Sequence, residues 1–453
     1  MNTKLLKQKI LDLAIRGKLV PQDPNDEPAS ELLKRIRAEK EKLIAEGKIK
    51  RSKKAGDKPH YENENAPFEI PESWEWEKLQ NIAFVGTGAT PKVSNSEYYG
   101  GTIPWIGSGA TNNDFVITPN LYITEKALRE TNCQIYPIGT IVMAMYGEGK
   151  TRGQVCELTI ECATNQACAA IVPFVFTTKD YIKLFLIGNY YTIRKLSGGG
   201  VQPNLNLETI KNYWIPIPPL IEQKRIVSEA LKWFALIDEI EIHKQSLGDA
   251  IKQTKSKVLD LAFHGKLVSQ NSKDEPAIEL LRRINPNAAI CDTLHYGNLP
   301  TNWCTSSLEC LCTSIASKKY QIKQSEINKS GKYPVISQSA NFIEGYSDVD
   351  SKLLHIPSPI IVFGDHTRIT KYIDFDFIVG ADGVKILQPL IPAKYFYYLT
   401  QYVAGKIENR GYSRHYGYLS RCIVPIPPKE ELERIALRIE ELFNVLDKIS
   451  ADL

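Results

Sequence analysis

Residues 11–36 read LDLAIRGKLVPQDPNDEPASELLKRI, and residues 259–284 read LDLAFHGKLVSQNSKDEPAIELLRRI. The two stretches align without a gap at a constant offset of 248, and 18 of their 26 positions are identical. An internal repeat restricts the architecture of a chain before any single element is considered. The repeat and the length of 453 residues therefore predict two related units instead of one large core.

A second repeat lies at the other end of each expected unit. Residues 215–219 read IPIPP and residues 424–428 read VPIPP, an offset of 209, and the match continues until Phe234 aligns with Phe443. In the middle of the chain this second repeat runs directly into the LDLA repeat. At the ends the two are separated, because the chain begins with the LDLA repeat and ends with the second repeat. Only residues 245–248 lack a counterpart at the two ends. We predict a two-unit ring opened once, with its ends close together and jointly imitating one continuous helix.

An apolar spacing of four and then three residues follows the second repeat. A mean spacing of 3.5 residues is typical of helices that wrap around each other. One amphipathic helix on a globular core would show a similar pattern, but the chain ends supply a partner helix with the same spacing. We therefore predict an antiparallel coiled coil. Its seam consists of Leu6, Ile10, Leu13, Ile226, Trp233, Ile237, Ile240, Leu247, Ile251, Val258, Leu261, Ile435, Ile439, Leu442, Leu446 and Ile449.

Composition restricts the compartment and the class of partner. No apolar run approaches the roughly 18 residues of a membrane span, and nine scattered cysteines without a CxxC motif indicate reduced thiols and no zinc site. We therefore expect a cytoplasmic protein without membrane contact. Residues 31–58 carry a net charge of +6, against +4 for the whole chain. The lysines of this run could contact phosphate groups, or the run could be a solvated linker.

The segments between the repeats each have the size of a domain. Both begin alike, with IPESW at residues 70–74 and LPTNW at residues 299–303. Short β-branched runs separated by Gly, Pro and Asn, with a few helices, predict an α+β fold of mixed sheets with helices packed on them. Beyond the shared landmarks the two sequences hardly agree. Two similar frames that present different loops would suit a reader of two different half-sites.

Three stretches resemble enzyme motifs but lack the required context. Residues 84–88 (FVGTG) resemble a loop that binds S-adenosylmethionine, but a further loop follows where a helix is needed. Residues 149–151 (GKT) resemble the end of a P-loop, but Ala144 stands where that motif needs glycine. His366 lies beside Asp365 without a nucleophile or a metal-ligand pattern. We predict no catalytic residue, metal or cofactor in this chain.

Polar loops that follow equivalent expected strands fit base recognition better. Arg and Lys donate to guanine edges and Asn and Gln pair with adenine, each good bidentate contact being worth about 1–3 kcal/mol of discrimination. For any single residue, a solvated surface side chain is the alternative. The candidate DNA-contacting residues are Thr90, Lys92, Lys150, Thr151, Arg152, Gln154, Gln202, Asn204, Lys318, Lys319, Asp365, His366, Thr367, Arg368, Lys371, Arg410, Tyr412, Arg414 and His415.

Taken together, these motifs resemble the specificity subunit of type I restriction–modification enzymes over essentially the whole chain. The stretches that carry the resemblance are the LDLA repeat, IPESWEW at residues 70–76, QPNLN at residues 202–206, the two PIPP copies and EQKRIV at residues 222–227. The second domain departs from the pattern, because residues 416–419 (YGYL) stand where the first has QPNLN. Residue roles at that loop are therefore not carried over.

The resemblance implies a non-catalytic subunit whose two target-recognition domains each read one half of a bipartite double-stranded DNA target. Helices between them would form the coiled coil and set the spacing. Two modification subunits, which bind S-adenosylmethionine and methylate adenine, would dock with near two-fold symmetry. Two restriction subunits would add ATP- and Mg-dependent translocation and cleavage. The assembled complex would thus be an adenine-specific DNA methyltransferase and an ATP-dependent endonuclease.

The expected domains follow from the repeats. They are a helical arm with a basic linker (1–66), a first target-recognition domain (67–219), a central helical region (220–295), a second target-recognition domain (296–428) and a C-terminal helix that pairs with the central one (429–453). Two alternatives remain: a fragment of a fused methyltransferase–nuclease, and a coiled-coil scaffold without a nucleic-acid role. Methyl transfer by the isolated chain would favour the former, and DNA binding with little salt dependence the latter.

Overall fold

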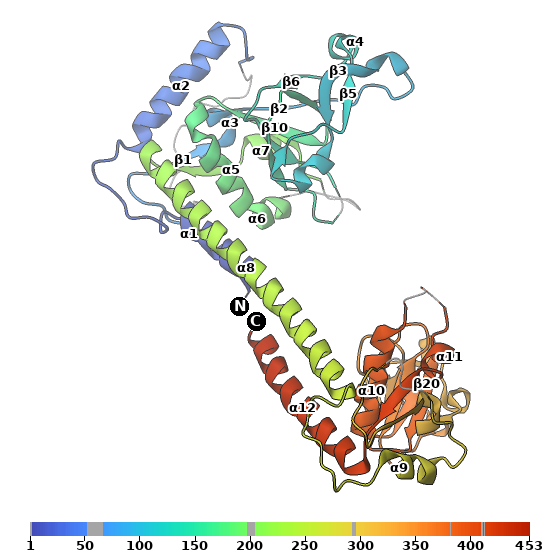
Figure 1. The fold of residues 1–453 in the computed structure, drawn as a ribbon. Helices are drawn as coiled ribbons and strands as arrows, with labels where there is room; N and C mark the ends of the chain where they lie inside the picture. The colour runs from blue at the N-terminus through green and yellow to red at the C-terminus, as the bar shows by residue number, and fades with distance from the viewer. Residues whose placement is uncertain are drawn as a thin grey trace. The chain divides into compact units, whose positions relative to one another are not determined.

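The computed structural model describes residues 2–51, 67–147, 149–196, 204–291, 296–380, 382–408, 411 and 413–453. The chain divides into two compact units, residues 2–242 and residues 243–453. Each unit has its own hydrophobic core. The helix α8 (Leu220–Phe263) contributes its first part to the first unit and its last part to the second (Figure 1).

The first unit combines helices with short strands. Its helices are α1 (Thr3–Ile15), α2 (Ala29–Ala45), α3 (Leu79–Ile82), α4 (Glu125–Glu130), α5 (Lys179–Gly188), α6 (Tyr190–Lys195), α7 (Leu207–Lys211) and the first part of α8. Its strands are β1 (Glu75–Lys78), β2 (Ala83–Thr87), β3 (Tyr99–Ile106), β4 (Phe115–Val116), β5 (Leu121–Ile123), β6 (Ile135–Tyr136), β7 (Ile141–Ala144), β8 (Val155–Leu158), β9 (Cys162–Thr164), β10 (Cys168–Pro173) and β11 (Trp214–Ile217).

The second unit has a similar set of elements. Its helices are the last part of α8, α9 (Ala277–Ile284), α10 (Ala393–Lys406), α11 (Tyr416–Leu419) and α12 (Lys429–Asp452). Its strands are β12 (Cys304–Ser307), β13 (Cys312–Ile315), β14 (Tyr333–Ile336), β15 (Gly345–Ser347), β16 (Leu353–Leu354), β17 (Ile360–Gly364), β18 (Thr370–Ile373), β19 (Phe377–Val379), β20 (Val384–Pro389) and β21 (Ile423–Ile426).

The two units share one sheet topology, although their loops differ in sequence. The order β2-β10-β7-β8 in the first unit corresponds to β13-β20-β17-β18 in the second, and β5-β3-β9-β6 corresponds to β15-β14-β19-β16. The directions agree too, since β3 pairs with β9 and β14 with β19 in parallel, while the flanking pairs are antiparallel. The strand β4 extends the first sheet. The predicted mixed α+β frame, present twice, is confirmed.

A short two-stranded ribbon places each IPIPP copy beside the start of its domain. The strand β1 pairs with β11 in an antiparallel register, with Trp76 opposite Pro216, and β12 pairs with β21, with Thr305 opposite Pro425. Proline donates no backbone hydrogen bond and is confined to edges in sheets. The two-stranded ribbon accommodates proline for that reason.

In each unit an antiparallel helix pair joins one copy of the LDLA repeat to one copy of the second repeat. In the first unit Lys7 of α1 forms an ion pair with Asp238 of α8, and Thr3 donates a hydrogen bond to Glu241, so the numbering runs in opposite directions. In the second unit Lys255 of α8 forms an ion pair with Asp447 of α12. These two ion pairs stand at the two repeat offsets, because 255 is 7 plus 248 and 447 is 238 plus 209.

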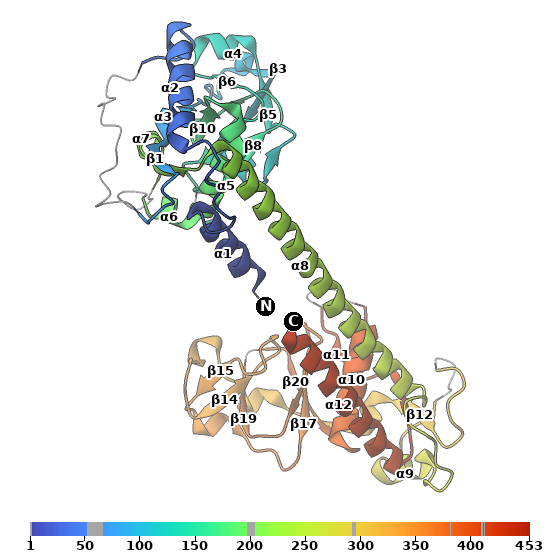
Figure 2. The same cartoon turned by 90° about the vertical axis from the view of Figure 1, so that its left-hand side faces the viewer.

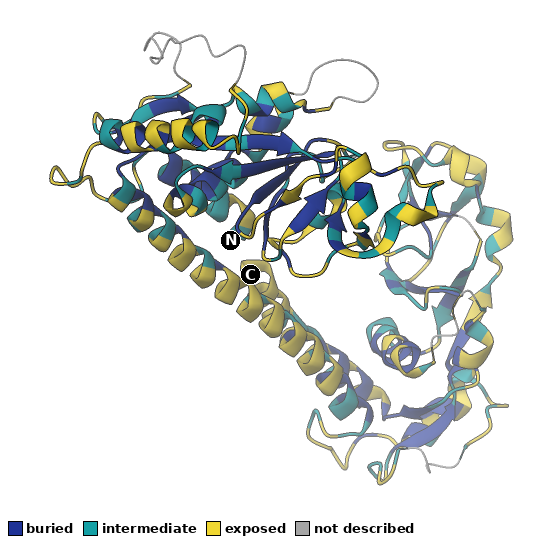
Figure 3. Ribbon diagram, turned by 90° about the horizontal axis from the view of Figure 1, so that it is seen from above, coloured by how far each residue is buried: buried dark blue, intermediate teal, exposed yellow. Residues whose placement is uncertain are grey.

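The predicted seam is only partly buried. Its buried members are Ile10, Ile226, Ile237, Ile251, Val258, Ile435 and Ile439. Leu6, Leu13, Leu261, Leu442 and Leu446 are half-buried. Trp233, Ile240, Leu247 and Ile449 are 37–42% exposed. A straight helix drifts by about 20° per heptad from a 3.5-residue spacing, which turns some positions away from the partner helix. Figure 3 shows the strands mostly buried and one side of the helices exposed.

One glycine in each LDLA repeat explains how the helix ends and the next segment packs. Gly17 has a φ of +66° and Gly265 a φ of +69°, just after α1 and α8 end. A Cβ atom on Gly17 would lie 2.5 Å from Pro71 Cγ, and one on Gly265 would lie 2.4 Å from Pro300 Cγ. Glycine is therefore needed both for its left-handed backbone and for the close approach of the proline.

The two units differ in the length of the helix that follows this glycine. α2 has 17 residues, whereas its counterpart α9 has 8. The repeat offset falls from 248 in the first part of this helix to 229 at the following IPESW segment, so the first unit contains 19 additional residues between these two points. The longer helix packs on its own domain, since Lys40 Nζ donates to Gln80 O at 3.0 Å and burial lowers the pKa of Lys40.

Candidate nucleic-acid interface

Loops from separate parts of the first unit meet at one edge of its sheets. Thr90 Oγ1, in the loop after β2, donates a hydrogen bond of 2.7 Å to Gln166 Oε1, in the loop after β9. The backbone N–H of Met145, just after β7, donates to Ala167 O at 2.8 Å, and Leu205 N donates to Met145 O at 3.1 Å. The candidate residues Thr90, Lys150 to Gln154 and Asn204 therefore belong to one linked set of loops.

The corresponding edge of the second unit is organised by Gln338, which follows β14. His366 N donates to Gln338 Oε1 at 3.1 Å, and Thr367 Oγ1 donates to Gln338 O at 2.7 Å. Gln338 Nε2 in turn donates to Asp382 O at 2.8 Å. This glutamine thus joins the β17–β18 hairpin to the loop before β20. Figure 2 shows β17 and β20 side by side in this unit, as their pairing requires.

Asp365 and His415 are buried and connect two loops of this edge. Asp365 Oδ1 accepts a hydrogen bond of 2.7 Å from Tyr416 N, at the start of α11. Asp365 O accepts a hydrogen bond of 2.8 Å from His415 N and lies 2.9 Å from His415 Nδ1. The two residues are 3% and 0% exposed, so neither side chain lies at the surface of this structure. Both residues were predicted to contact DNA, and we propose from their burial that they position the loops instead.

Lys371 also turns inward. Its Nζ donates to the backbone oxygen of Asn341, and its side chain is 4% exposed. Burial lowers the pKa of this ammonium group. Arg368 NH1 donates to Ile407 O, at the end of α10. Lys371 was predicted to contact DNA, and we propose from its burial that it supports the loop instead. One guanidinium nitrogen of Arg368 is occupied by the helix end.

The remaining candidates fall into three groups. Thr90, Lys92, Lys150, Asn204, Lys318, Lys319, Thr367 and Arg414 are exposed. Thr151, Arg152, Gln154 and His366 are half-buried. Gln202, Arg410 and Tyr412 lie outside the described residues, as do Lys53, Lys54 and Lys58 of the basic run.

The glycine-rich stretch that resembles a cofactor loop has a packing role. A Cβ atom on Gly88 would lie 1.7 Å from Thr164 O, so this position tolerates no side chain. Glycine in a strand often marks such a close approach between two backbones. Among the described residues, no group of three or more His, Cys, Asp or Glu side chains could hold a metal ion. The described helices include none that is long and apolar enough to cross a membrane.

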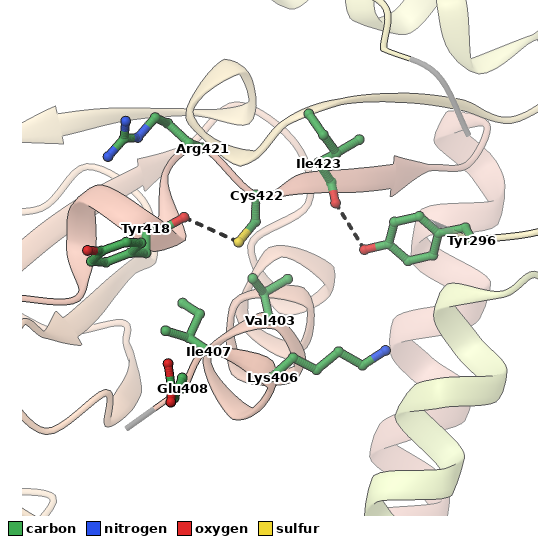
Figure 4. Close-up of a pocket in the computed structure, with 9 residues that line it drawn as sticks. All are labelled: Tyr296, Val403, Lys406, Ile407, Glu408, Tyr418, Arg421, Cys422 and Ile423. Atoms are coloured by element: carbon green, nitrogen blue, oxygen red, sulfur yellow. Dashed lines mark hydrogen bonds between the residues drawn. The ribbon is translucent and has the colours of Figure 1, made fainter. Parts of the chain in front are cut away.

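The second unit has a pocket of about 510 Å³ between the end of α10, α11 and β21 (Figure 4). Tyr296 Oη donates to Ile423 O at 3.1 Å, and Cys422 Sγ donates to Tyr418 O at 3.2 Å. Burial raises the pKa of Cys422, which keeps the thiol protonated and makes it a poor nucleophile. The pocket therefore gives no support for chemistry at this cysteine.

The family model for the type I restriction modification DNA specificity domain matches residues 71–252 and 300–453. The chain belongs to this family. The two matched segments overlap the two expected recognition domains, 67–219 and 296–428, from residues 71 and 300 onward. The match supports neither a fused methyltransferase–nuclease nor a scaffold without a nucleic-acid role.

Members of the specificity family with curated descriptions resemble this chain over part of their length. The type I restriction enzyme EcoAI specificity subunit of Escherichia coli is 32% identical over 334 residues, which is 62% of this chain and 55% of that protein. The EcoEI specificity subunit of the same organism is 31% identical, over 62% of this chain and 54% of that protein. The chain thus spans about half the length of the curated relatives it matches.

A solved structure supports the fold of this specificity chain. A chain from a study of complex assembly and conformational transition in a type I restriction–modification system superposes with a TM-score of 0.57 at 16% identity. The superposition covers 85% of this chain and 94% of that one.

The residues that hold the candidate loops in place were missed by sequence reasoning. Gln338 holds the second-unit hairpin, and Arg194 and Tyr190 of α6 contact the loop after β7 in the first unit. Gln166 holds Thr90. The spacing of Tyr190 and Arg194, four residues apart on a helix, puts both on one face and could have indicated a shared task.

Proposed function

We propose that this chain is the sequence-specific DNA-binding subunit of a type I restriction–modification enzyme. Each unit would read one half of a bipartite target. The observation that carries the proposal is the pairing of one sheet topology, present twice, with two unrelated sets of exposed polar loops. A duplicated frame keeps two readers in equivalent positions, and different loops let each recognise a different sequence.

Affinity and specificity would come from different residues. The exposed Lys92, Lys150, Lys318, Lys319 and Arg414 would contact phosphate groups or guanine, and the amides and hydroxyls nearby would read other bases. Binding should therefore weaken steeply with salt. The logarithm of the binding constant should fall with the logarithm of the salt concentration, with a slope of about 0.9 for each phosphate neutralised. The basic run after α2 would add a sequence-independent contribution.

The helices would set the spacing between the half-sites. We propose that the antiparallel pairs found in each unit belong to one coiled coil, with the two chain ends close together as in an opened ring. Such a rod would act as a ruler, because each reader contributes only when it reaches its bases without strain on the other. The domain limits 1–66, 67–219, 220–295, 296–428 and 429–453 would describe the arm, the two readers and the helices.

The chain itself would be non-catalytic. Two modification subunits carrying S-adenosylmethionine and two restriction subunits using ATP and Mg would supply adenine methylation and cleavage, in the cytoplasm. The exposed apolar side chains of α8, which include Leu231, Leu236 and Ile242, would offer contact area for these subunits.

Methylation mapping tests the proposal. The full chain is expressed with the modification subunit of its own system in cells carrying a plasmid library of random sequence, and methylated adenines are located by single-molecule sequencing. We expect one bipartite sequence with a fixed spacer. The same cells without this chain are the control and should show no such methylation. An uninterrupted target, or methylation independent of the chain, would overturn the proposal.

A further inference from the structure

Two side chains of α6 hold three backbone carbonyl groups of the loop between β7 and β8. Arg194 NH1 donates to Arg152 O at 2.6 Å, and Arg194 NH2 donates to Gly149 O at 2.7 Å. Tyr190 Oη donates to Lys150 O at 2.6 Å. Tyr190 and Arg194 also contact each other, with NH1 3.2 Å from the tyrosine oxygen. Two side chains on one face of one helical turn therefore hydrogen-bond to most of the tip of this loop.

The backbone of this loop is intrinsically free to move. Gly147, Gly149 and Gly153 all have positive φ, at +137°, +64° and +84°. Glycine loses more conformational freedom on ordering than any other residue, so a loop with three of them takes one shape only if other contacts define it. At its base the loop closes with Gly153 N donating to Ala144 O at 2.8 Å. The side chains from α6 extend that order to the tip.

We propose that Arg194 is a positioning residue, which sets the base specificity of the first recognition domain by fixing this loop without contacting DNA itself. The proposal rests on the function proposed above, since the loop carries the candidate readers Lys150, Thr151 and Arg152. A planar guanidinium group bridges two carbonyl oxygens with donors in a fixed geometry, which a lysine ammonium group does not reproduce. Arginine is thus the residue type that this task requires.

The second domain ties its equivalent hairpin to a helix through a different arginine. Arg368 lies on the β17–β18 hairpin, and its NH1 donates to Ile407 O at the end of α10. In the first domain the arginine is on the helix and the carbonyl groups are on the loop. The donor and the acceptor have therefore exchanged places between the two domains. The ion pairs between the long helices use corresponding residues in the two units, whereas this tie uses different positions in each. Its recurrence indicates a requirement on loop position and not the retention of one residue.

The test compares variants of the full chain, assembled with its modification subunits, on the random library and in DNA binding at several salt concentrations. Arg194→Ala should relax base preference in the first half-site by about tenfold, the lower range for one lost bidentate contact. The second half-site should keep its preference and is the internal control. Tyr190→Phe should change the same half-site in the same direction and less, and Arg194→Lys should restore only part of the preference. Lys195→Ala removes the same charge one residue along the helix and should leave both half-sites unchanged.

The outcomes separate the possible roles. A weaker base preference in the first half-site, with an unchanged salt dependence of DNA binding, supports positioning. Unchanged preference together with a slope reduced by about 0.9 would identify a phosphate contact and overturn the proposal. Unchanged preference and slope would overturn it as well. If Arg194→Ala does not assemble, Tyr190→Phe decides by the same criterion. A wild-type chain that directs no bipartite methylation would reject the proposed function instead, so the two failures are distinguishable.

Discussion

The indole Nε1 of Trp74 donates a hydrogen bond of 2.9 Å to a carboxylate oxygen of Glu222. The second unit repeats the contact between Trp303 and Glu431 at 3.1 Å. Both carboxylates are 1% exposed, and each also accepts a hydrogen bond from a glutamine of the LDLA repeat. The start of each long helix is therefore joined to the start of its recognition domain through a buried acceptor.

Glu222→Gln should destabilise the first unit, because both of its partners are donors. Gln22 Nε2 and Trp74 Nε1 each face one carboxylate oxygen, so an amide NH₂ would meet one of them without an acceptor. Leaving a buried donor unsatisfied costs about 1–3 kcal/mol. Calorimetry should show a lower unfolding temperature, by roughly 2–4 °C for each kcal/mol. Glu69→Gln, at an exposed carboxylate, should change little; equal effects of the two substitutions would contradict this account.

Stability should depend on pH through the same two carboxylates. Burial raises the pKa of Glu222 and of Glu431 above the ordinary value of 4.5. The folded protein then binds these protons more tightly than the unfolded chain, so their contribution is fully present below 4.5 and is lost as pH rises through the raised pKa values. Wild type should therefore gain stability relative to the Glu222→Gln/Glu431→Gln variant as pH falls from about 7 to about 5. A difference that stays constant over this range would exclude the raised pKa values.

Two substitutions of Arg368 should distinguish the effect of its strained backbone from the effect of its side-chain hydrogen bond. Its φ of +61° is a left-handed conformation that costs a non-glycine residue roughly 1–2 kcal/mol. Arg368→Gly and Arg368→Ala both remove the tie to Ile407, but glycine relieves the strain and should give the more stable variant. In library mapping, both variants should show a weaker base preference in the second half-site and an unchanged preference in the first. Equal melting temperatures for the two variants would contradict the strain argument.

Lengthening the helices should move the half-sites apart. An insertion of four residues after Gln245 adds about one helical turn, roughly 5.4 Å. At about 3.4 Å per base pair, the spacer should grow by one to two base pairs. Methylation mapping measures the spacer directly, and replacement of residues 245–248 without a change of length is the control. A spacer that stays the same in the insertion variant would refute the ruler.

A circularly permuted chain should keep its target. The ends would be joined through a copy of residues 245–248, and the chain would be reopened by deleting those residues from α8. If the two ends jointly imitate the middle of a helix, the permuted chain should methylate the same sequence with the same spacer. Loss of assembly by this chain, while a chain with the original ends and residues 245–248 replaced without a change of length still assembles, would place the ends apart.

The helical framework could be predicted because it is carried by side chains that the repeat preserves. Lys7 and Lys255 stand at one offset and Asp238 and Asp447 at the other, so an ion pair found in one unit implies its counterpart in the other. The glycines that end α1 and α8 are visible in the sequence for the same reason. Short β-branched runs separated by Gly, Pro and Asn likewise predicted mixed sheets.

The candidate interface was less predictable because its contacts use backbone atoms. Lys371 donates to a carbonyl group 30 residues away, and Arg194 reaches a carbonyl group 42 residues away. Every residue has a carbonyl oxygen, so such a partner leaves no trace in side-chain identity. Asp365 likewise caps α11 through a backbone N–H, and a polar residue in a polar loop gives no indication that it is buried.

The framework contacts named above join residues of the same unit, and this has a consequence for how such a gene could change. A genetic exchange with its crossover within the codons for the middle of α8 would transfer one half with its tryptophan, carboxylate and ion pair intact. The recipient would inherit a new reader without a mismatch in the old one. A cell could thereby change the sequence recognised by one half of the chain in one event, while the sequence recognised by the other half stayed the same.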